Sequence, residues 1–268
     1  MPAQGTTGGS AAGTAVSILE VKSLSVSYNG THAVDCVDLE IIPGEIFGLL
    51  GPNGAGKPST LSAIEGLVRP QSGSITVDGI NVHAHPSIAR SRMGVQLQST
   101  SFQAELTISQ IIRLYAGLYG VTLQNSSLAG LLRDIHLENE ASRRFDQLSG
   151  GQQQRVSLLL ATIHNPPLVL LDEPTAGLDP QARRQLWDRI EGIRERGHSI
   201  LLTTHSMEEA QAVCDRVAIM DHGRILAIDT PAELIRKNKD DSRVLKAAHG
   251  EVTLEDVFIG LTGSDLRD

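Results

Sequence analysis

The hydrophobic and polar positions of the chain first follow a period of two. Three segments between Ser17 and Val82 alternate in this way: "SILEVKSLSVSY", "HAVDCVDLEII" and "GSITVDGINV". Such alternation is typical of strands with one buried face, and the Asp78-Gly79 pair inside the third segment is typical of a hairpin turn. We therefore expect an antiparallel β layer near the N-terminus.

The pattern then changes to continuous apolar runs that alternate with helical periods. "GEIFGLLG", "PLVLLDEP" and "SILLTTH" are short apolar runs of the kind found in strands that are buried on both faces. The first run leads through a glycine-rich loop into "STLSAIEGLV", where Leu61, Ile64 and Leu67 share one helical face. This order predicts a parallel sheet that is covered by helices on both faces.

Two further helices are predicted on either side of "SILLTTH". "PQARRQLWDRIEGIRERG" precedes this run, and the apolar face of its predicted helix consists of Leu186, Trp187, Ile190 and Ile193. The helix that follows begins at Ser206, with Glu209 three residues on, which is the pattern of a capping box. In such a box, each of the two side chains accepts a hydrogen bond from a backbone N–H group of the first turn.

The remaining segments complete the predicted architecture. The stretch from about 86 to 165 is mainly helical in period, whereas residues 1–15 lack an apolar period and are expected to form a flexible tail. Near the C-terminus, "KNKDDSRVLK" is predicted to be a charged linker and "EVTLEDVFIGLTG" a short amphipathic ending. The predicted fold class is α/β, with a mostly parallel sheet, an N-terminal antiparallel β subdomain and an inserted helical subdomain.

Composition and charge narrow the class of protein. The chain has 268 residues, 40% of them hydrophobic, which is enough to bury the core of one large domain with subdomains. Its formal net charge of -8 argues against nucleic acid as the main partner. The longest apolar runs are shorter than the roughly 20 residues that span a bilayer, and no basic segment followed by an apolar one stands at the N-terminus. We expect a cytoplasmic protein.

"GPNGAGKPST", from Gly51 onward, comes close to a phosphate-binding loop. Gly51, Gly54 and Gly56 allow the backbone to fold tightly with its N–H groups pointing inward, and the next helix adds the positive end of its dipole. Lys57 would add a charge at the outer phosphates. The motif then requires Ser or Thr, whose hydroxyl binds Mg²⁺, but position 58 is a proline.

Pro58 is expected to affect chemistry more than folding. A proline is tolerated in the first turn of a helix, so the fold can accept it. It offers neither a metal-binding oxygen nor a backbone N–H group for phosphate, and it biases Lys57 away from helical angles. Ser59 and Thr60 could replace the hydroxyl only if the loop shifts, because neighbouring helical residues point about 100° apart. We expect weakened binding of nucleotide and Mg²⁺ and strongly reduced hydrolysis.

Two other motifs carry polar groups with the same chemistry. "LVLLDEP" ends a buried strand with Asp172 and Glu173, where one acid can hold the water shell of a metal ion and the other can deprotonate an attacking water. The alternative for Asp172 is an ordinary helix N-cap. "LSGGQQQR" opens a helix with a serine and two glycines, a shape that suits an anion but is also compatible with a simple cap.

Taken together and in this order, "GPNGAGKPST", "GVQLQST", "LSGGQQQR", "LVLLDEPTAGLD" and "LLTTH" strongly resemble the nucleotide-binding subunit of ABC transporters. The resemblance covers about residues 18 to 263, and "LSGGQ" followed by "LLDEPTAGLD" is highly specific. It implies a P-loop ATPase core that uses ATP and Mg²⁺. The implied organisation is a tail over 1–15, a nucleotide-binding domain over 16–240 with its helical subdomain at about 86–165, and a C-terminal extension over 241–268.

The resemblance assigns residues to the nucleotide and to the metal ion. Tyr28 matches an aromatic residue that stacks on adenine, with packing in the β layer as the alternative. Gln98 matches the glutamine that touches Mg²⁺ and the attacking water, and Gln96 is the other candidate for this role. The loop residues implied in nucleotide binding are Gly51, Pro52, Asn53, Gly54, Ala55, Gly56, Lys57, Ser59 and Thr60.

The resemblance also assigns the catalytic groups. Asp172 matches the metal-associated aspartate, and Glu173 matches the general base. His205 matches the histidine that contacts the γ-phosphate and fixes the base. Asp179, in "AGLD", matches the loop through which the two sites of a dimer communicate.

The last implication concerns partners. Ser149, Gly150, Gly151 and Gln152 would complete the nucleotide pocket of a second nucleotide-binding subunit in a head-to-tail dimer, homomeric or heteromeric. The dimer would act on a separate integral-membrane permease, which places it at the inner face of the cell membrane. "GRILAIDTPAEL" and the C-terminal ending are similar to ATP-binding subunits of bacterial drug and antibiotic export. Pro58 leaves a second hypothesis, a degenerate regulatory subunit that lacks its own ATPase activity.

Overall fold

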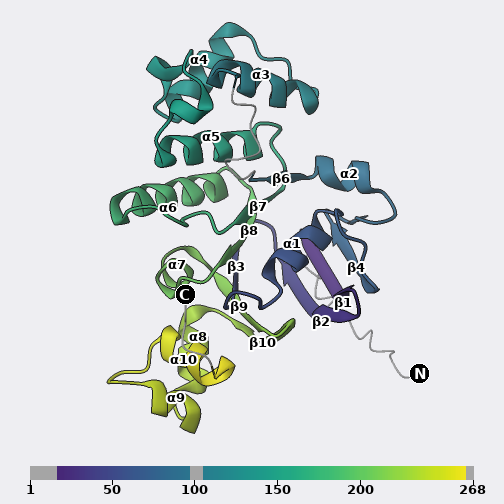
Figure 1. The fold of residues 1–268 in the computed structure, drawn as a ribbon, viewed down its shortest axis with the longest axis vertical. Coiled ribbons are helices and arrows are strands. Elements are labelled where there is room, and N and C mark those ends of the chain that lie inside the picture. Colours follow the sequence, from purple (N-terminus) through teal and green to yellow (C-terminus); the bar gives the residue numbers. More distant parts are fainter. Residues whose placement is uncertain (1–16, 97–104, 264–268) are drawn as a thin grey trace, which may run out of the picture.

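The computed structural model describes residues 17–96 and 105–263, and two sheets form its framework (Figure 1). The smaller sheet is antiparallel and has the strand order β2-β1-β4-β5. Asp78 and Gly79 both adopt positive φ angles in the turn between β4 and β5, as predicted. The strands of this sheet are β1 (Leu19–Tyr28), β2 (Thr31–Ile41), β4 (Ser72–Val77) and β5 (Ile80–Asn81).

The larger sheet has six strands in the order β10-β9-β3-β8-β7-β6. Every neighbouring pair from β9 to β6 is parallel, whereas β10 and β9 are antiparallel. The mostly parallel sheet and the antiparallel N-terminal layer are therefore confirmed. The strands of this sheet are β3 (Ile46–Leu50), β6 (Met93–Val95), β7 (Leu168–Asp172), β8 (Ser199–Thr204), β9 (Arg216–Asp221) and β10 (Arg224–Asp229).

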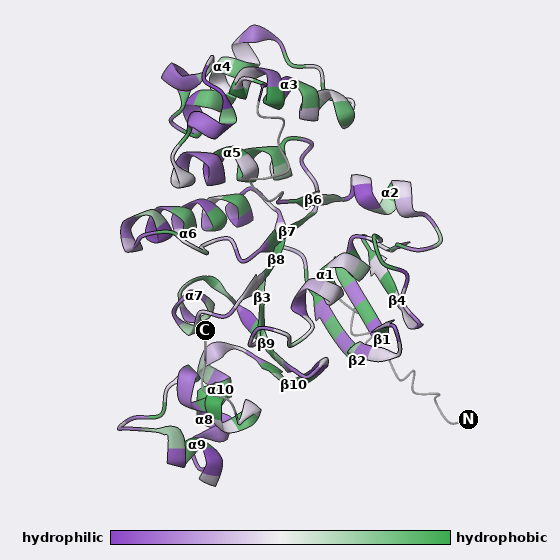
Figure 2. Cartoon of the chain, in the orientation of Figure 1, coloured by the Kyte–Doolittle hydropathy of each residue, from purple (hydrophilic) through white to green (hydrophobic). Residues whose placement is uncertain are grey.

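Helices cover both faces of the six-stranded sheet, and the buried apolar residues form three cores, two of which include the sheet. One core joins the sheet to the antiparallel layer and α1, a second joins its other face to α6, α7, α8, α9 and α10, and a third holds α3, α4 and α5 together. Figure 2 shows β3, β7 and β8 as hydrophobic and β1 and β2 as alternating bands, in agreement with burial on two faces and on one face. The helices are α1 (Lys57–Ile64), α2 (Pro86–Ser91), α3 (Ile108–Leu118), α4 (Asn125–Asp134), α5 (Gly150–Thr162), α6 (Pro180–Glu195), α7 (Met207–Val213), α8 (Pro231–Asn238), α9 (Ser242–Ala247) and α10 (Leu254–Thr262), and two 3-10 turns lie at Glu138–Glu140 and Phe145–Gln147.

The predicted apolar face of the first helix is wrong at its last position. Helix α1 ends at Ile64, and Gly66 then takes a left-handed conformation with φ +69°. The chain turns back there, because the N–H group of Leu67 donates to the carbonyl of Ser62. Leu67 is 67% exposed as a result and does not join the core.

The predicted charged linker is wrong in part, because it contains a helix. Asp241 caps α9 by accepting a hydrogen bond from the N–H group of Arg243, and Val244 is fully buried. At Gly260 of α10 a side chain would lie 2.8 Å from the backbone nitrogen of Val244, so the two helices meet at a glycine. A six-residue helix is too short to show a helical period among charged residues.

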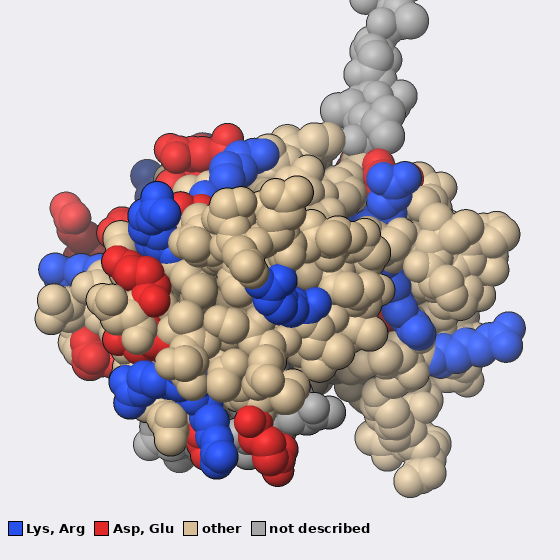
Figure 3. Space-filling model, turned by 90° about the horizontal axis from the view of Figure 1, so that it is seen from above, with Lys and Arg blue, Asp and Glu red and all other residues tan. Residues whose placement is uncertain are grey.

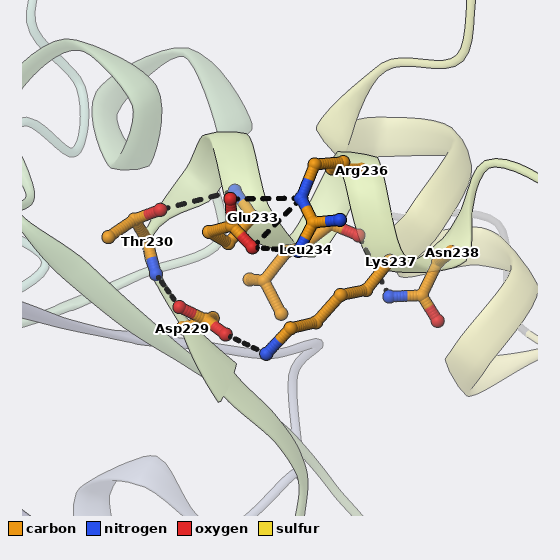
Figure 4. A network of polar contacts seen from close by, with 7 residues as sticks. All are labelled: Asp229, Thr230, Glu233, Leu234, Arg236, Lys237 and Asn238. Carbon is orange, nitrogen blue, oxygen red and sulfur yellow. Dashed lines mark hydrogen bonds and ion pairs between the residues drawn. The ribbon is translucent and has the colours of Figure 1, made fainter.

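A polar network fixes α8 to the edge strand β10 (Figure 4). Thr230 caps α8 by accepting a hydrogen bond from the N–H group of Glu233, and Lys237 pairs with Asp229 at 2.5 Å. Glu233 also pairs with Arg236 at 2.6 Å within the helix. Exposed ion pairs of this kind contribute at most about 1 kcal/mol each, so their main effect is to orient the helix.

The surface is mixed in charge on the face that Figure 3 shows, where Lys and Arg lie among Asp, Glu and uncharged groups. Within residues 17–96 and 105–263, no helix is long and apolar enough to cross a membrane.

Candidate functional site

The glycine loop joins β3 to α1 and is held by tight backbone contacts. Its first N–H group, on Gly51, donates to the carbonyl of Thr204 at 3.3 Å. Gly54 and Gly56 have φ angles of +82° and +107°, and a Cβ atom on Gly56 would lie 2.4 Å from the carbonyl oxygen of Ala33. Gly56 is the N-cap of α1 and brings no side-chain acceptor, so the first N–H groups of the helix face the loop.

Lys57 lies in this loop with its ammonium group inside the fold. Its side chain is 3% exposed, and Nζ donates to the carbonyls of Gly51 at 2.6 Å and Pro52 at 3.2 Å. Burial lowers the pKa of Lys57, while the nearby carboxylates of Glu173 and Asp172 oppose this shift. A positive charge is thus held at the point where the loop and the acidic strand end meet.

Pro58 stands in the first turn of α1, and the helix begins at Lys57. The fold therefore accepts the proline, as predicted. Thr60 is fully buried, and its hydroxyl donates to the carbonyl of Gly56 at 3.0 Å. This hydroxyl is thus already bonded within the first turn of α1, while Ser59 is partly exposed.

The two acidic residues of "LVLLDEP" are oriented by a threonine on the neighbouring strand. The hydroxyl of Thr203 donates to Oδ1 of Asp172 at 2.5 Å and accepts the N–H group of Glu173 at 3.0 Å. Asp172 is the last residue of β7, not a helix N-cap. Sequence reasoning missed Thr203, although "LLTTH" places two hydroxyls directly before the histidine.

Glu173 has an unusual backbone and a central position. Its φ angle is +43°, a left-handed conformation that costs a non-glycine residue free energy and is common at functional sites. Oε1 of its carboxylate lies 3.8 Å from Nζ of Lys57 and 3.4 Å from Nδ1 of His205. Three side chains from distant parts of the sequence are thus brought together at the carboxyl ends of β3, β7 and β8.

The "LSGGQQQR" motif begins α5. Ser149 and Gln152 form a capping box, in which the Ser149 hydroxyl accepts the N–H group of Gln152 and the Gln152 side chain accepts that of Ser149. Added Cβ atoms at Gly150 and Gly151 would meet nothing within 4 Å. The motif is therefore both an ordinary cap and an open backbone surface, which leaves room for a ligand or partner.

The segment between Glu173 and α6 is tied to its neighbours. Gln154 of α5 donates from Nε2 to the carbonyl of Pro174 at 2.6 Å, a contact that the sequence did not indicate. Asp179 caps α6 by accepting the N–H groups of Gln181 and Ala182. A cleft of about 450 Å³ lies between the start of α5 and this segment, and it is lined in part by Ser149 and Asp179.

Tyr28 and Gln98 are predicted to contact the nucleotide and the metal ion, and the structure describes only the first of them. Tyr28 ends β1 with 46% of its surface exposed, which leaves its ring accessible. Gln98 lies outside the described residues. Gln96, the alternative, follows β6 and donates its backbone N–H group to the carbonyl of Leu170 at 2.9 Å, while its buried Oε1 has no partner among the described residues.

The comparisons with known proteins agree with this arrangement. Residues 34–176 match the family described as ABC transporter, and the chain belongs to that family. Within it, the chain is an ATP-binding subunit, as its motifs indicated. It is 38% identical over 219 residues to Nod factor export ATP-binding protein I of Rhizobium etli, an alignment that covers 81% of this chain and 69% of the relative.

Two solved structures share the fold. One is an ATP-binding subunit of an ABC transporter, with a TM-score of 0.78 and 31% identity over 91% of this chain and 99% of the other. The second is a dimeric bacterial ABC transporter cassette, with a TM-score of 0.71 and 25% identity over 79% of this chain and 98% of the other.

Proposed function

We propose that this chain is the ATP-binding subunit of an ABC export system, which acts on a separate membrane permease from the cytoplasmic face of the membrane. The convergence of Lys57, Glu173 and His205 carries the proposal, because it places a phosphate-binding charge, a base and a histidine around one point. Export is supported by the name of the Rhizobium etli relative and by the similar C-terminal ending. The cargo would be selected by the permease.

Each of the residues around this point would have a different role in ATP hydrolysis. The loop from Gly51 to Lys57 would bind the phosphates, with its glycine N–H groups and the Lys57 ammonium as donors. Glu173 would accept a proton from the attacking water, and His205 would hold that carboxylate and contact the γ-phosphate. The adenine ring would stack on Tyr28.

The donor set fits Mg²⁺ only in part. Asp172 has a carboxylate at the strand end that Thr203 orients, so it would hold the water shell of the ion. Bound Mg²⁺ would neutralise charge on the phosphates. Position 58 supplies no oxygen, and the Thr60 hydroxyl is committed to the carbonyl of Gly56. We infer that Mg²⁺ binding and hydrolysis are weakened by Pro58.

The same observation favours a second candidate function. A subunit that binds nucleotide but hydrolyses it very slowly would serve as a regulatory partner, and a sister subunit would supply the turnover. The first candidate is preferred because His205 lies 3.4 Å from Glu173 and Thr203 orients Asp172, which is the arrangement that we propose for hydrolysis.

The proposed site is completed by a second nucleotide-binding subunit, which supplies its own Ser149, Gly150, Gly151 and Gln152. In Figure 1, α5 lies among the upper helices, whereas α1 lies lower in the view, to the right of β3, so the helix that the motif begins and the helix that follows the glycine loop are apart. The open backbone at Gly150 and Gly151 and the similarity to a dimeric cassette support this assembly. ATP would then join the two subunits, and hydrolysis would release them.

A charge placed on this open backbone is expected to block the dimer without blocking nucleotide binding. Gly151→Asp would set a carboxylate against the phosphates of the partner's nucleotide and weaken ATP-dependent dimerisation by at least about 100-fold. Sedimentation velocity with saturating ATP measures the dimer, and calorimetric titration measures binding to the loop of the same variant. Gly117→Asp, at an exposed glycine of α3 where a Cβ atom also meets nothing, is the matched control. Undiminished dimerisation of Gly151→Asp would contradict the assembly.

A further inference from the structure

Gln154 joins the first part of α5 to the turn that follows Glu173. Its Nε2 donates to the carbonyl of Pro174 at 2.6 Å, in a partly buried position. This distance lies at the short end of the range for an N–H···O hydrogen bond. The two residues are 20 positions apart in the sequence, so the bond fixes one segment of the fold to another.

The carbonyl of Pro174 lies in a turn that also contains its own hydrogen bonds. The N–H group of Ala176 donates to the carbonyl of Glu173 at 3.1 Å, and that of Leu178 donates to the carbonyl of Thr175 at 3.1 Å. Pro174 itself is buried and has no backbone N–H group. Since a buried carbonyl that loses its donor is costly, the bond from Gln154 helps to determine where this turn lies.

Glu173, the proposed base, is held by hydrogen bonds on both sides. Its left-handed backbone, with φ +43°, persists only where the surrounding structure holds it. The hydroxyl of Thr203 accepts its N–H group at 3.0 Å, and Gln154 bonds the carbonyl of the next residue. The Gln154 side chain is therefore one of the contacts that fix the backbone on which the base is carried.

The other end of this link is the motif that begins α5. Gln154 lies four residues after Gly150, so the two share one face of the helix. Both line the cleft of about 450 Å³ that also contains Gly151 and Asp179. In the proposed dimer this face would meet the nucleotide of the partner. One side chain thus joins the motif to the turn that follows the base.

We propose that Gln154 is a positioning residue for the base, because its bond to Pro174 holds the turn after Glu173 and with it the carboxylate. The proposal rests on the proposed hydrolytic function for its effect on turnover. It requires no contact of Gln154 with nucleotide or metal ion.

The neighbouring glutamine provides a matched control. Nε2 of Gln153 donates to the carbonyls of Phe145 at 3.2 Å and Leu148 at 3.4 Å, which lie just before α5. Gln153→Met therefore removes an amide donor from the same helix without releasing the turn after Glu173.

The kinetic test uses the Pro58→Thr chain with its permease as the parent. Gln154→Met keeps the length of the side chain and its helix propensity but removes the donor. We expect kcat to fall at least about ten-fold, because the base loses its placement. KM for ATP should change by less than about two-fold, since the loop contacts remain. Gln154→Glu, which cannot donate when ionised, should show the same loss. Unchanged kcat in both variants, or an equal loss in Gln153→Met, would overturn the proposal.

A second substitution separates placement of the base from general damage to the site. Glu173→Gln removes the base, so in that chain Gln154 has no base to position. Adding Gln154→Met to the Pro58→Thr chain with Glu173→Gln should lower the residual turnover by less than about two-fold. A further loss of about ten-fold would contradict the assigned role.

Hydrogen exchange tests the same bond without hydrolysis. In the otherwise unaltered chain, Gln154→Met should raise the exchange of the amides of Ala176 and Leu178 at least about five-fold, because both lie in the turn that Gln154 holds. The amide of Val257 in α10 should exchange as before. Unchanged exchange at the first two amides, or an equal rise at Val257, would sink the proposal. If the Pro58→Thr parent does not hydrolyse ATP, the proposed function fails, and exchange still decides whether Gln154 holds the turn.

Discussion

Pro58→Thr is expected to raise the Mg²⁺-dependent ATP turnover of the chain with its permease on the order of 100-fold. Threonine restores a hydroxyl for Mg²⁺ at the start of α1 and a backbone N–H group for phosphate, and both act on the same ligand. The gain should therefore exceed what either contact would provide alone. Initial rates of phosphate release at saturating ATP and Mg²⁺ measure it.

The matched control is another proline in the first turn of a helix. Pro231 occupies that position in α8, away from the glycine loop, so Pro231→Thr should leave turnover unchanged. This control distinguishes the effect of the hydroxyl introduced at position 58 from a general effect of replacing a proline in the first turn of a helix. Equal turnover of the Pro58→Thr chain and the original chain would contradict the role assigned to the missing hydroxyl.

Glu173→Gln in the Pro58→Thr chain is expected to lower turnover by about 10²- to 10⁴-fold, the usual contribution of a general base. The amide has the size of the carboxylate but cannot accept the proton of the attacking water. Binding of ATP should persist, because the phosphates are held by the loop and by Lys57. The rate of phosphate release and calorimetric titration of the same variant measure the two quantities.

Glu195→Gln, at an exposed acid that ends α6, provides the control for this substitution. It should hydrolyse ATP at the rate of the Pro58→Thr parent. If Glu173→Gln retained the turnover of that parent, the base would have to be another residue, and the convergence of Lys57, Glu173 and His205 would need a different explanation.

The framework of the site was predictable because its signals are local. Apolar runs that end in a glycine loop, in Asp172 and Glu173 or in His205 indicate buried parallel strands, and the carboxyl ends of parallel strands lie at one edge of a sheet. The glycine loop, the acidic pair and His205 come together in the structure because each follows the carboxyl end of a parallel strand. The distances around Glu173 could not be predicted, because they depend on the pairing of β7 with β8.

The residues whose roles the sequence did not indicate act through contacts with segments that are distant in the sequence. Thr203 lies opposite Asp172 in the pairing of β7 with β8, and this register decides its role. Glu209 has the spacing of a capping box, but the N–H group of Ser206 donates to the hydroxyl of Thr204 instead, and Nε1 of Trp187 donates to the Glu209 carboxyl. A local pattern is overridden here by tertiary contacts that no spacing reveals.

Short elements were missed for a different reason. The three residues of β6 and the six of α9 are too few to display a period, so the first is hidden in a helical stretch and the second in a charged one. Leu67 was misplaced because Gly66 ends α1 with a turn that brings its chain back to Ser62.

Calorimetric titration with ATP and Mg²⁺, applied to the original chain and to Pro58→Thr, tests most directly whether the loop after β3 still receives a polyphosphate. We predict that heat of binding is measured for both and that the threonine variant binds more tightly. If neither chain took up adenine nucleotide under these conditions, the assignment of this site to ATP would be contradicted.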